Sequence, residues 1–469
     1  MFVDRDRELA FLARAWSSQR AELLVVYGRR RVGKTALLRQ FCLGRSHTFW
    51  VASLSSEALL RQSFTQALWQ STHPDRPDPG FTYATWQRAF EALADVATDQ
   101  RHVVVLDEFP YLAHTETSVP SVLQQVWDER LQHTRLVLIL CGSQIGMMEQ
   151  EVLLYRAPLY GRRTGQILLR PLPVSTATAF FPRYTPVQQL EAHAILGGIP
   201  AYLGQFDDRE AVLPNIEHHI LARESMLAME PLFLLREELR EPRNYFAILQ
   251  AIAQGRTRLN EIAQATGIER QPVSRYLAVL QDLQLVERRV PVTEAHPEKS
   301  RKGLYQLRDH FLRFWFRFVL PHTSLLESGQ TAPVLQRVAA DLPTFLGLVF
   351  EEICREWVRD HSAPTPWGFL PTRVGAWWER EAEIDVVAIG EDAVLVGECK
   401  RTTRPVGTNV LDDLKRTAYP LIHQGGWATV VYVLFARAGF TPAVEARARE
   451  EGVLLVSPTH LLVPGGTAR

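Results

Sequence analysis

Short apolar runs alternate with helical repeats along the first third of the chain. Leu23–Tyr27 is an apolar run of strand length, and Lys34–Leu43 continues with apolar residues at helical spacing. Val103–Leu106 and Leu136–Leu140 are two further runs of the kind that form buried strands. Strands that alternate with helices are typical of a parallel sheet covered by helices, so we predict an α/β domain over residues 1–170.

The pattern changes twice before residue 320. Residues 171–239 read as mostly helical, with a break at Gly197–Pro200. Residues 240–320 hold three short amphipathic helices and then two strand-like runs, the order of a winged helix-turn-helix. The expected helices are Tyr245–Gln254, Leu259–Ala265 and Gln271–Leu283, and the expected wing strands are Leu285–Pro291 and Gly303–Leu307.

The last third of the chain contains a second α/β pattern. Pro321, Pro333 and Pro343 predict a connecting segment over residues 321–344. Over residues 345–469 the pattern is helix, three strands, helix, strand and helix. The chain is therefore expected to be a multidomain α/β protein.

Composition excludes several classes of protein. The 52 basic and 52 acidic residues balance, which argues against a uniformly basic nucleic-acid coat but leaves room for a local basic patch. No apolar run approaches the roughly 20 residues needed to span a bilayer, so no membrane partner is expected. The charged segment Met1–Glu8 does not read as a signal peptide. The four cysteines lack CxxC spacing and are interpreted as reduced thiols of a cytoplasmic protein.

A phosphate-binding loop follows the first predicted strand. Gly28–Thr35 reads GRRRVGKT and fits the pattern GxxxxGK[ST] between a strand and a helix. Lys34 is expected to reach the β- and γ-phosphates of ATP, and the Thr35 hydroxyl to bind Mg²⁺. An ordinary glycine-rich turn is the alternative. The expected nucleotide-binding residues of the loop are Gly28, Arg29, Arg30, Arg31, Val32, Gly33, Lys34, Thr35 and Ala36.

Two acids end the second buried strand. Asp107 and Glu108 directly follow Val103–Leu106, and the carboxyl ends of strands are where ligands bind in open α/β sheets. Asp107 is expected to hold the magnesium ion, and Glu108 to polarise the water that attacks the γ-phosphate.

Two more positions are candidates for the hydrolysis site. Ser143 follows Leu136–Leu140 and is a candidate γ-phosphate sensor, the alternative being a simple Gly-Ser turn. Arg162 and Arg163 are candidates for stabilising transition-state charge, in the same chain or in a neighbouring subunit. The second case would require a homo-oligomer, and an exposed salt bridge is the alternative to both.

The C-terminal domain carries a candidate metal site. Glu383–Ile389 and Val394–Lys400 read as strands of a hairpin, and period-two alternation places Glu398 and Lys400 on one face. Thirteen residues separate Asp385 from Glu398, so both carboxylates can reach one Mg²⁺ from adjacent strands.

An Asp, Glu and Lys set of this kind suits metal-assisted cleavage of a phosphodiester. The carboxylates would bind the metal, and Lys400 would help to stabilise the attacking hydroxide and the transition state. Glu351 or Glu352, on the preceding helix, is expected to supply a further ligand. The alternative is a cluster of charges on a solvated hairpin.

Basic residues concentrate in the predicted winged helix. Residues 240–320 contain fourteen basic and eight acidic side chains within a neutral chain. Arg270 and Arg275 lie at or near the start of the third helix, and Arg301 and Lys302 in the wing. Such residues would contact DNA phosphates, with an affinity that falls as salt rises.

Motifs over about residues 1–235 resemble a known family. They are Phe2–Glu8, GRRRVGKT, LDEFPYL at 106–112, CGS at 141–143, LYGR at 159–162 and GGIP at 197–200. In this order they resemble the prokaryotic, mainly archaeal, ATPase family within the STAND/AAA+ relatives. The resemblance implies an AAA+-type core, a helical lid and a winged helix. It also implies contact of Pro200 with the adenine and a slow nucleotide switch rather than a fast motor. In STAND relatives the winged helix often packs on the nucleotide core without touching DNA.

The C-terminal motifs carry two further resemblances. The element order with D…ExK resembles the PD-(D/E)XK nuclease fold, also called restriction-endonuclease-like. Segments from about residue 305 resemble a domain of unknown function that commonly follows these ATPases. They are YQLRDHFLRFWFRFVLP at 305–321, FEEI at 350–353, WWE at 377–379, EIDVVAI at 383–389 and GECK at 397–400. The fold carries over, whereas such domains can keep the motif and serve only as binding modules.

The leading hypothesis is an ATP-binding and hydrolysing switch that acts on DNA through a magnesium-dependent, nuclease-like C-terminal domain regulated by nucleotide. The alternative is a non-cleaving, ATP-dependent regulator of DNA or protein binding, with the C-terminal domain as a docking module. A third hypothesis is a partner-recognition scaffold whose winged helix never meets DNA.

Overall fold

The structure is a computed structural model that describes residues 2–463 apart from residues 74, 76, 77, 79, 240, 241, 362–364, 380 and 381. The chain forms two compact units. Unit 1 comprises Met1–Leu172 with Ile199–Ala201, and unit 2 comprises Pro173–Gly198 with Tyr202–Arg469. The bounds of the smaller domains within unit 2 stay predictions.

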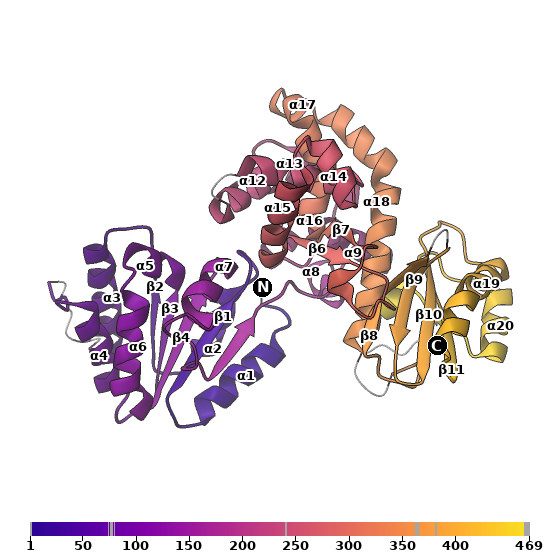
Figure 1. Ribbon diagram of the computed structural model, residues 1–469. Coiled ribbons are helices and arrows are strands. Elements are labelled where there is room, and N and C mark those ends of the chain that lie inside the picture. The colour runs from indigo at the N-terminus through magenta and orange to yellow at the C-terminus, as the bar shows by residue number, and fades with distance from the viewer. Residues whose placement is uncertain are drawn as a thin grey trace. The chain divides into compact units, whose positions relative to one another are not determined.

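Unit 1 is built on a parallel sheet of five strands in the order β2-β3-β4-β1-β5 (Figure 1). The strands are β1 (Glu22–Tyr27), β2 (His47–Val51), β3 (His102–Asp107), β4 (Leu136–Gly142) and β5 (Gly165–Leu168). The helices are α1 (Asp6–Ser17), α2 (Lys34–Cys42), α3 (Glu57–Thr72), α4 (Trp86–Val96), α5 (Phe109–Thr115), α6 (Val119–Glu129) and α7 (Ile145–Met148). The predicted parallel α/β domain is confirmed.

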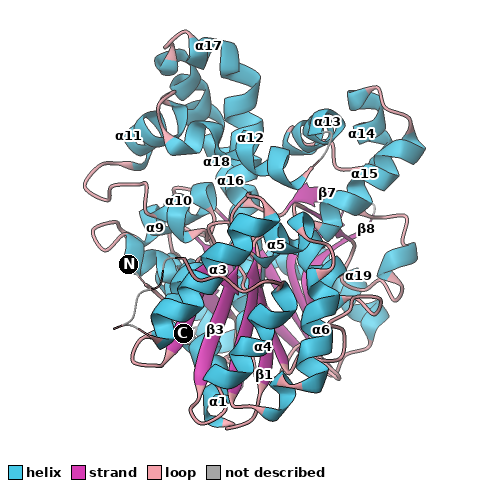
Figure 2. Ribbon diagram, turned by 90° about the vertical axis from the view of Figure 1, so that its left-hand side faces the viewer, coloured by secondary structure: helices cyan, strands magenta, loops and turns pink. Residues whose placement is uncertain are grey.

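Strands β1, β3 and β4 are buried along their whole lengths. Alternate side chains of these strands, such as Val104 and Leu138, pack with Phe90 of α4 and Leu123 of α6 in one core. Figure 2 shows α4 and α6 in front of the strands of this sheet. Because the strands are parallel, their carboxyl ends meet at one edge of the sheet, where α/β proteins bind ligands.

Unit 2 opens with helices and continues with the winged helix-turn-helix. The first helices are α8 (Ala177–Phe180), α9 (Pro186–Leu196), α10 (Pro200–Leu203, which begins in unit 1), α11 (Val212–Ile216) and α12 (Met226–Glu238). The winged part consists of α13 (Pro242–Ala253), α14 (Leu259–Thr266), α15 (Arg270–Asp282) and the antiparallel pair β6 (Val286–Arg289) and β7 (Leu304–Leu307). The predicted break at Gly197–Pro200 and the predicted wing are both present.

Residues 321–344, expected to be a connecting segment, are mostly helical. After α16 (His310–Phe314) and α17 (Thr323–Glu327), one helix of 30 residues, α18, runs from Thr331 to Asp360. Pro333 lies in its first turn, where a backbone N–H has no partner within the helix. Pro343 lies inside and removes a hydrogen bond at a cost of about 3 kcal/mol. A continuous buried face offsets that cost; it includes Val334, Val338, Leu342, Phe345, Leu346 and Val349.

A mixed sheet ends the chain, in the order β12-β11-β10-β9-β8 (Figure 1). Its strands are β8 (Arg373–Glu379), β9 (Ala382–Ile389), β10 (Ala393–Lys400), β11 (Thr429–Ala436) and β12 (Leu454–Val456). Strands β8, β9 and β10 pair antiparallel, whereas β10, β11 and β12 pair parallel across α19 (Thr408–Gly425) and α20 (Pro442–Glu451). Helix α21 (Pro458–Leu462) follows. The predicted order of elements is present from α18 to α20, and β12 and α21 follow it as elements that were not predicted. None of the helices in the described residues is long and apolar enough to cross a membrane.

Candidate functional site

The loop between β1 and α2 adopts a conformation that depends on its glycines. Gly28 has φ 151° and Gly33 has φ 100°, both in the left-handed region that glycine tolerates best. A Cβ atom on Gly28 would lie 2.4 Å from the carbonyl oxygen of Leu169, a clash with backbone. The predicted strand–loop–helix context of the phosphate loop is therefore present. A side chain at position 28 is excluded by the backbone of Leu169.

Lys34 is the first residue of α2 and is 5% exposed. Its Nζ donates to the carbonyl oxygens of Gly28 at 2.9 Å and Arg29 at 3.1 Å. The ammonium group thus lies folded over the loop itself, next to the helix N-terminus, where an anion is favoured.

Three strand ends bring the predicted catalytic side chains together. The Thr35 hydroxyl donates to Asp107 Oδ2 at 2.7 Å. Glu108 follows with φ 53°, a left-handed conformation that is strained for a residue with a side chain and is concentrated at functional sites. The Ser143 hydroxyl donates to Glu108 Oε2 at 2.7 Å. The loop after β1 and the ends of β3 and β4 therefore build one polar site from residues that are distant in sequence.

Pro200 also lies against this loop within unit 1. A Cβ atom on Gly33 would lie 4.0 Å from Pro200 Cγ, which is ordinary van der Waals contact. Gly197, with φ 67°, ends α9 and starts the turn that leads to Pro200. The structure thus brings Pro200 to the phosphate loop, and the contact with adenine that the GGIP resemblance implies stays a prediction.

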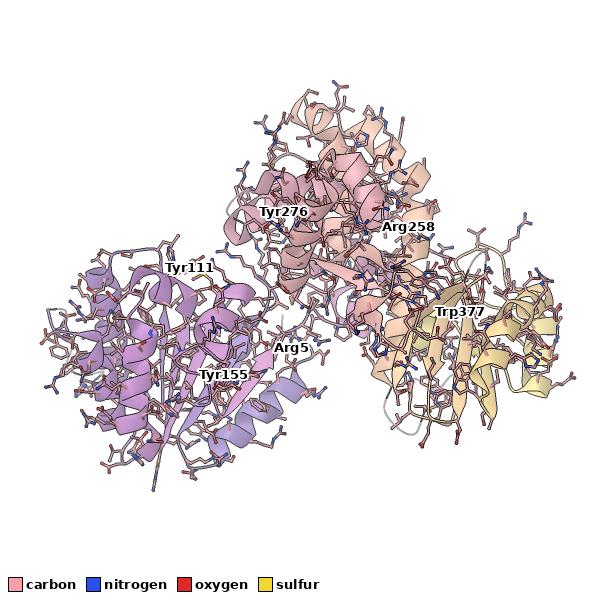
Figure 3. The ribbon with its side chains drawn as sticks, in the orientation of Figure 1. Arg5, Tyr111, Tyr155, Arg258, Tyr276 and Trp377 are labelled. Carbon is pink, nitrogen blue, oxygen red and sulfur yellow. The ribbon has the colours of Figure 1, made fainter. Side chains whose placement is uncertain are left out.

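Arg5 is a residue of the site that sequence reasoning did not single out. It is 7% exposed, and its Nη2 donates to the carbonyl oxygens of Val32 at 3.2 Å and Arg170 at 2.8 Å. Figure 3 labels its side chain. The guanidinium therefore fixes the outer side of the phosphate loop to the segment after β5. Its place in the Phe2–Glu8 motif was the available signal.

Arg162 is engaged in an ion pair in this structure. It forms a two-pronged ion pair with Asp128 of α6, with Nε–Oδ1 at 3.2 Å and Nη2–Oδ2 at 2.9 Å. Arg163 donates to the carbonyl oxygen of Leu153 at 2.9 Å. In the single chain, Arg162 therefore forms a salt bridge, which was the alternative to a role in hydrolysis.

The second candidate site lies on β9 and β10. Gly397 pairs with Val386, so the next step of the antiparallel register places Glu398 beside Asp385. The Asp385 carboxylate accepts a hydrogen bond from the Cys399 backbone N–H at 2.8 Å, and Lys400 Nζ lies 2.5 Å from Glu398 Oε1. The predicted shared face of Glu398 and Lys400 is confirmed.

Of the two glutamates proposed as a further ligand, Glu351 is the one next to these carboxylates. Burial and the neighbouring Asp385 charge raise the pKa of Glu351 to about 7. Burial also raises the pKa values of Asp385 and Glu398. Glu352 instead forms ion pairs with Arg313 at 2.9 Å and His310 at 3.3 Å. A bound cation would stabilise the charged form of carboxyl groups that lie this close together.

The carboxylates are close without forming a closed ligand set. Among the residues that the structure describes, no three His, Cys, Asp or Glu side chains are grouped so that they could hold a metal ion. Arg355, which is 4% exposed, lies between them: its Nη1 donates to the Asp385 carbonyl oxygen at 2.7 Å and lies 3.6 Å from Glu351 Oε2.

The winged helix presents its basic residues to solvent. Arg270 and Arg275 on α15 are exposed, as are Arg301 and Lys302 in the wing loop. Lys302 pairs with Glu294 at 2.9 Å. Arg288 instead holds the wing together by donating to the carbonyl oxygens of Pro297 and Ser300.

Comparisons with known proteins match three parts of the chain. Residues 2–206 match the family described as an ATPase domain predominantly from Archaea. Residues 243–290 match the IclR helix-turn-helix domain, and residues 315–410 match archaeal and bacterial proteins of unknown function. The resemblances to the archaeal ATPases and to the domain of unknown function are thereby confirmed.

Relatives in Methanocaldococcus jannaschii support the same assignment. Uncharacterized protein MJECL04 is 33% identical over 397 residues, which is 84% of this chain and 85% of that protein. Uncharacterized ATP-binding protein MJ0423 is 56% identical over 41 residues, 9% of this chain and 70% of that protein. The Walker-type ATPase PABY2304 of Pyrococcus abyssi superimposes with a TM-score of 0.50 and 22% identity, covering 67% of this chain and 96% of that one. That likeness shows the fold alone. The chain belongs to the same family as MJECL04 and carries an ATPase domain of the predominantly archaeal type, a helix-turn-helix and a C-terminal domain of unknown function.

Proposed function

We propose that this chain is an ATP-hydrolysing switch that acts on DNA, with a metal-dependent, nuclease-like C-terminal site whose cleavage is controlled by nucleotide. The observation that carries the proposal is the polar site at one edge of the unit 1 sheet. There Thr35 bonds to Asp107 and Ser143 bonds to Glu108. Lys34 lies folded over the phosphate loop.

Each member of this set has a distinct role. Lys34 binds the β- and γ-phosphates from the start of α2, and Arg29–Val32 surround them with the loop. Thr35 and Asp107 would hold Mg²⁺, which neutralises phosphate charge when it is bound. Glu108 orients the attacking water, and Ser143 fixes the Glu108 carboxylate by its 2.7 Å hydrogen bond. Pro200 packs against the adenine.

DNA contact is the role proposed for the winged helix. The support is the match of residues 243–290 to a helix-turn-helix domain and the exposure of Arg270, Arg275 and Arg301. Exposed guanidiniums bind phosphates with release of counterions, which gives salt-dependent affinity.

Phosphodiester cleavage is the role proposed for β9 and β10. The support is the adjacency of Asp385 and Glu398 in the strand register, the contact of Lys400 with Glu398, and Glu351 nearby on α18. Asp385 and Glu398 would hold Mg²⁺, which would supply the hydroxide nucleophile. Lys400 stabilises the negative charge that develops on the phosphate.

Control by nucleotide is supported by the course of the chain between the units. Pro200 lies against the phosphate loop in unit 1, and α9, which ends at Leu196, belongs to unit 2. A rearrangement at Pro200 on ATP binding reaches α9 through only three residues. An oligomer in which Arg162 acts on a neighbouring subunit also stays a prediction, and it requires the Asp128 ion pair to open.

A plasmid-cleavage assay with Mg²⁺ or Mn²⁺, with and without ATP, tests the proposal. Cleavage should depend on ATP and should be abolished in Asp385→Ala and in Lys400→Ala. Asp392→Ala, which removes an exposed acid from the β9–β10 turn, is the matched control and should cleave normally.

The alternative function is a non-cleaving regulator of DNA or protein binding. The lack of a closed metal-ligand set among the described residues favours it. Intact ATP hydrolysis without cleavage of any DNA or RNA substrate would select this alternative.

A further inference from the structure

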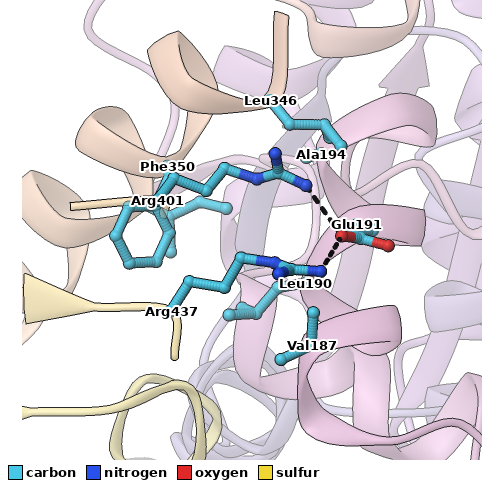
Figure 4. A pocket seen from close by; sticks show the side chains of 9 residues that line it. Val187, Leu190, Glu191, Ala194, Leu346, Phe350, Arg401 and Arg437 are labelled. Atoms are coloured by element: carbon cyan, nitrogen blue, oxygen red, sulfur yellow. Dashed lines mark hydrogen bonds and ion pairs between the residues drawn. The ribbon is translucent and has the colours of Figure 1, made fainter. Parts of the chain in front are cut away.

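Two arginines at the end of the C-terminal sheet converge on one carboxylate of α9. Arg401 directly follows β10, and Arg437 directly follows the neighbouring parallel strand β11. Both donate to the same oxygen, Glu191 Oε1, over 2.7 Å from Arg401 and 3.1 Å from Arg437 (Figure 4). All three residues belong to unit 2.

The ion pairs lie in a largely apolar pocket. Its walls come from α9 and α18 and consist of Val187, Leu190, Ala194, Leu346, Phe350 and Ile353. The side chains of Arg401, Arg437 and Glu191 are only 14%, 26% and 17% exposed. Charges that are withdrawn from water in this way interact more strongly than charges on an open surface.

The pocket holds more positive than negative charge. Glu191 is the single acid among the lining residues, and it faces two guanidiniums. Burial lowers the pKa of Arg401, and the nearby Arg437 charge adds to this effect against the opposing influence of Glu191. The Nε of Arg437 is buried and finds no hydrogen-bond acceptor in the described part of the chain. The two guanidinium groups share one carboxylate oxygen and have donors to spare. They could therefore bind an anion that offers several acceptor oxygens.

The arginine pair also lies next to the candidate cleavage site along the same strands. Lys400 pairs with Ala436 in the register of β10 and β11, and Arg401 and Arg437 are the next residues of the two strands. The Arg437 backbone N–H donates to the Lys400 carbonyl oxygen at 3.0 Å.

We propose that Arg401 and Arg437 form a binding site for a backbone phosphate of nucleic acid, and that Glu191 occupies this site as an internal substitute until the substrate displaces it. Guanidinium groups bind carboxylates and phosphates with the same planar, two-pronged geometry. The inference rests on the proposed action on DNA and adds a phosphate subsite that α9 covers.

The test is the affinity of the full chain for a 20-base-pair duplex, measured by fluorescence anisotropy over a range of salt concentrations. Glu191→Gln keeps the shape of the side chain but removes its charge, so affinity should rise at least fivefold. The slope of log K against log salt should steepen by about 0.9 for each additional phosphate that the protein neutralises. Replacing Arg401 and Arg437 by Gln in the same variant should abolish this gain in affinity and in slope.

Glu445→Gln is the matched control, because it removes one exposed acid from α20, away from the pocket lining. Equal affinity and slope in Glu191→Gln and Glu445→Gln would overturn the inference. If Glu191→Gln does not fold, the double variant Arg401→Gln and Arg437→Gln in the otherwise unchanged chain should lower the slope, and an unchanged slope would overturn it equally.

Failure of the proposed function has a different signature. A wild-type chain that does not bind DNA contradicts that function, whereas a rise in DNA affinity in Glu191→Gln still supports the subsite.

Discussion

The Thr35 hydroxyl donates to the Asp107 carboxylate over 2.7 Å, although 72 positions separate the two residues in the sequence. The strands that lead to them, β1 and β3, are not neighbours, since β4 lies between them in the sheet. Both groups are hard oxygen ligands of the kind that Mg²⁺ prefers. The fold therefore holds the two proposed metal ligands of the ATP site together in the chain itself.

Glu108 is expected to act on the water and not on the nucleotide. Glu108→Gln should lower kcat for ATP hydrolysis at least 100-fold, since a positioned base contributes roughly 10²–10⁴-fold, and should leave ATP affinity within a few-fold. Phosphate release and calorimetric titration measure the two quantities. The exposed Glu129 at the end of α6 provides the control, and Glu129→Gln should hydrolyse ATP normally. Equal rates in both variants would remove Glu108 from the mechanism.

Ser143 is expected to position Glu108. Ser143→Ala removes the 2.7 Å hydrogen bond to the Glu108 carboxylate, and a bond to a charged group contributes about 1.5–3 kcal/mol. We therefore expect kcat to fall about 10- to 150-fold with ATP affinity unchanged. The double variant with Glu108→Gln should be no slower than Glu108→Gln alone, because the two residues act as a unit. An unchanged kcat in Ser143→Ala would mean that Ser143 only completes a turn.

Arg275 on α15 is expected to contact a DNA phosphate. Arg275→Ala should weaken duplex binding and reduce the slope of log K against log salt by about 0.9. Arg449→Ala removes an equal charge from the exposed side of α20 and should change neither value. A wild-type slope in Arg275→Ala would favour a winged helix that does not meet DNA.

His102 is expected to make unit 1 less stable in acid. Burial lowers the pKa of its imidazole to about 4, with the His47 charge adding to the effect, while the ring nitrogens contact the hydroxyls of Ser46 and Thr48. Between pH 6.5 and about 4 the unfolded chain binds the proton and the folded chain does not, so stability falls as the pH falls. The contribution of this one group is at most ~3 kcal/mol. Thermal unfolding of wild type and His102→Gln at pH 7.5 and pH 5 should show a smaller loss in the variant.

The sequence predicted the parts of the site that depend on local pattern. Gly28–Thr35 and Asp107–Glu108 are contiguous motifs next to buried strands, and their spacing alone identifies the phosphate loop and the acidic strand end. The face shared by Glu398 and Lys400 follows from the two-residue period of a strand.

Contacts between distant segments were beyond the reach of these patterns. Glu191 and Arg401 are 210 positions apart, and no sequence motif at either residue indicates their contact. The helix through Pro343 was missed for a related reason, because the apolar face that offsets the proline is visible only once its packing partners are known.

Calorimetric titration of a non-hydrolysable ATP analogue with Mg²⁺ into the full chain tests the central claim most directly. The account predicts saturable binding of one nucleotide per chain and its loss in Lys34→Ala, because the buried Lys34 ammonium is the charge that the loop offers to the phosphates. Absence of binding to the wild-type chain, or equal binding to Lys34→Ala, would contradict it.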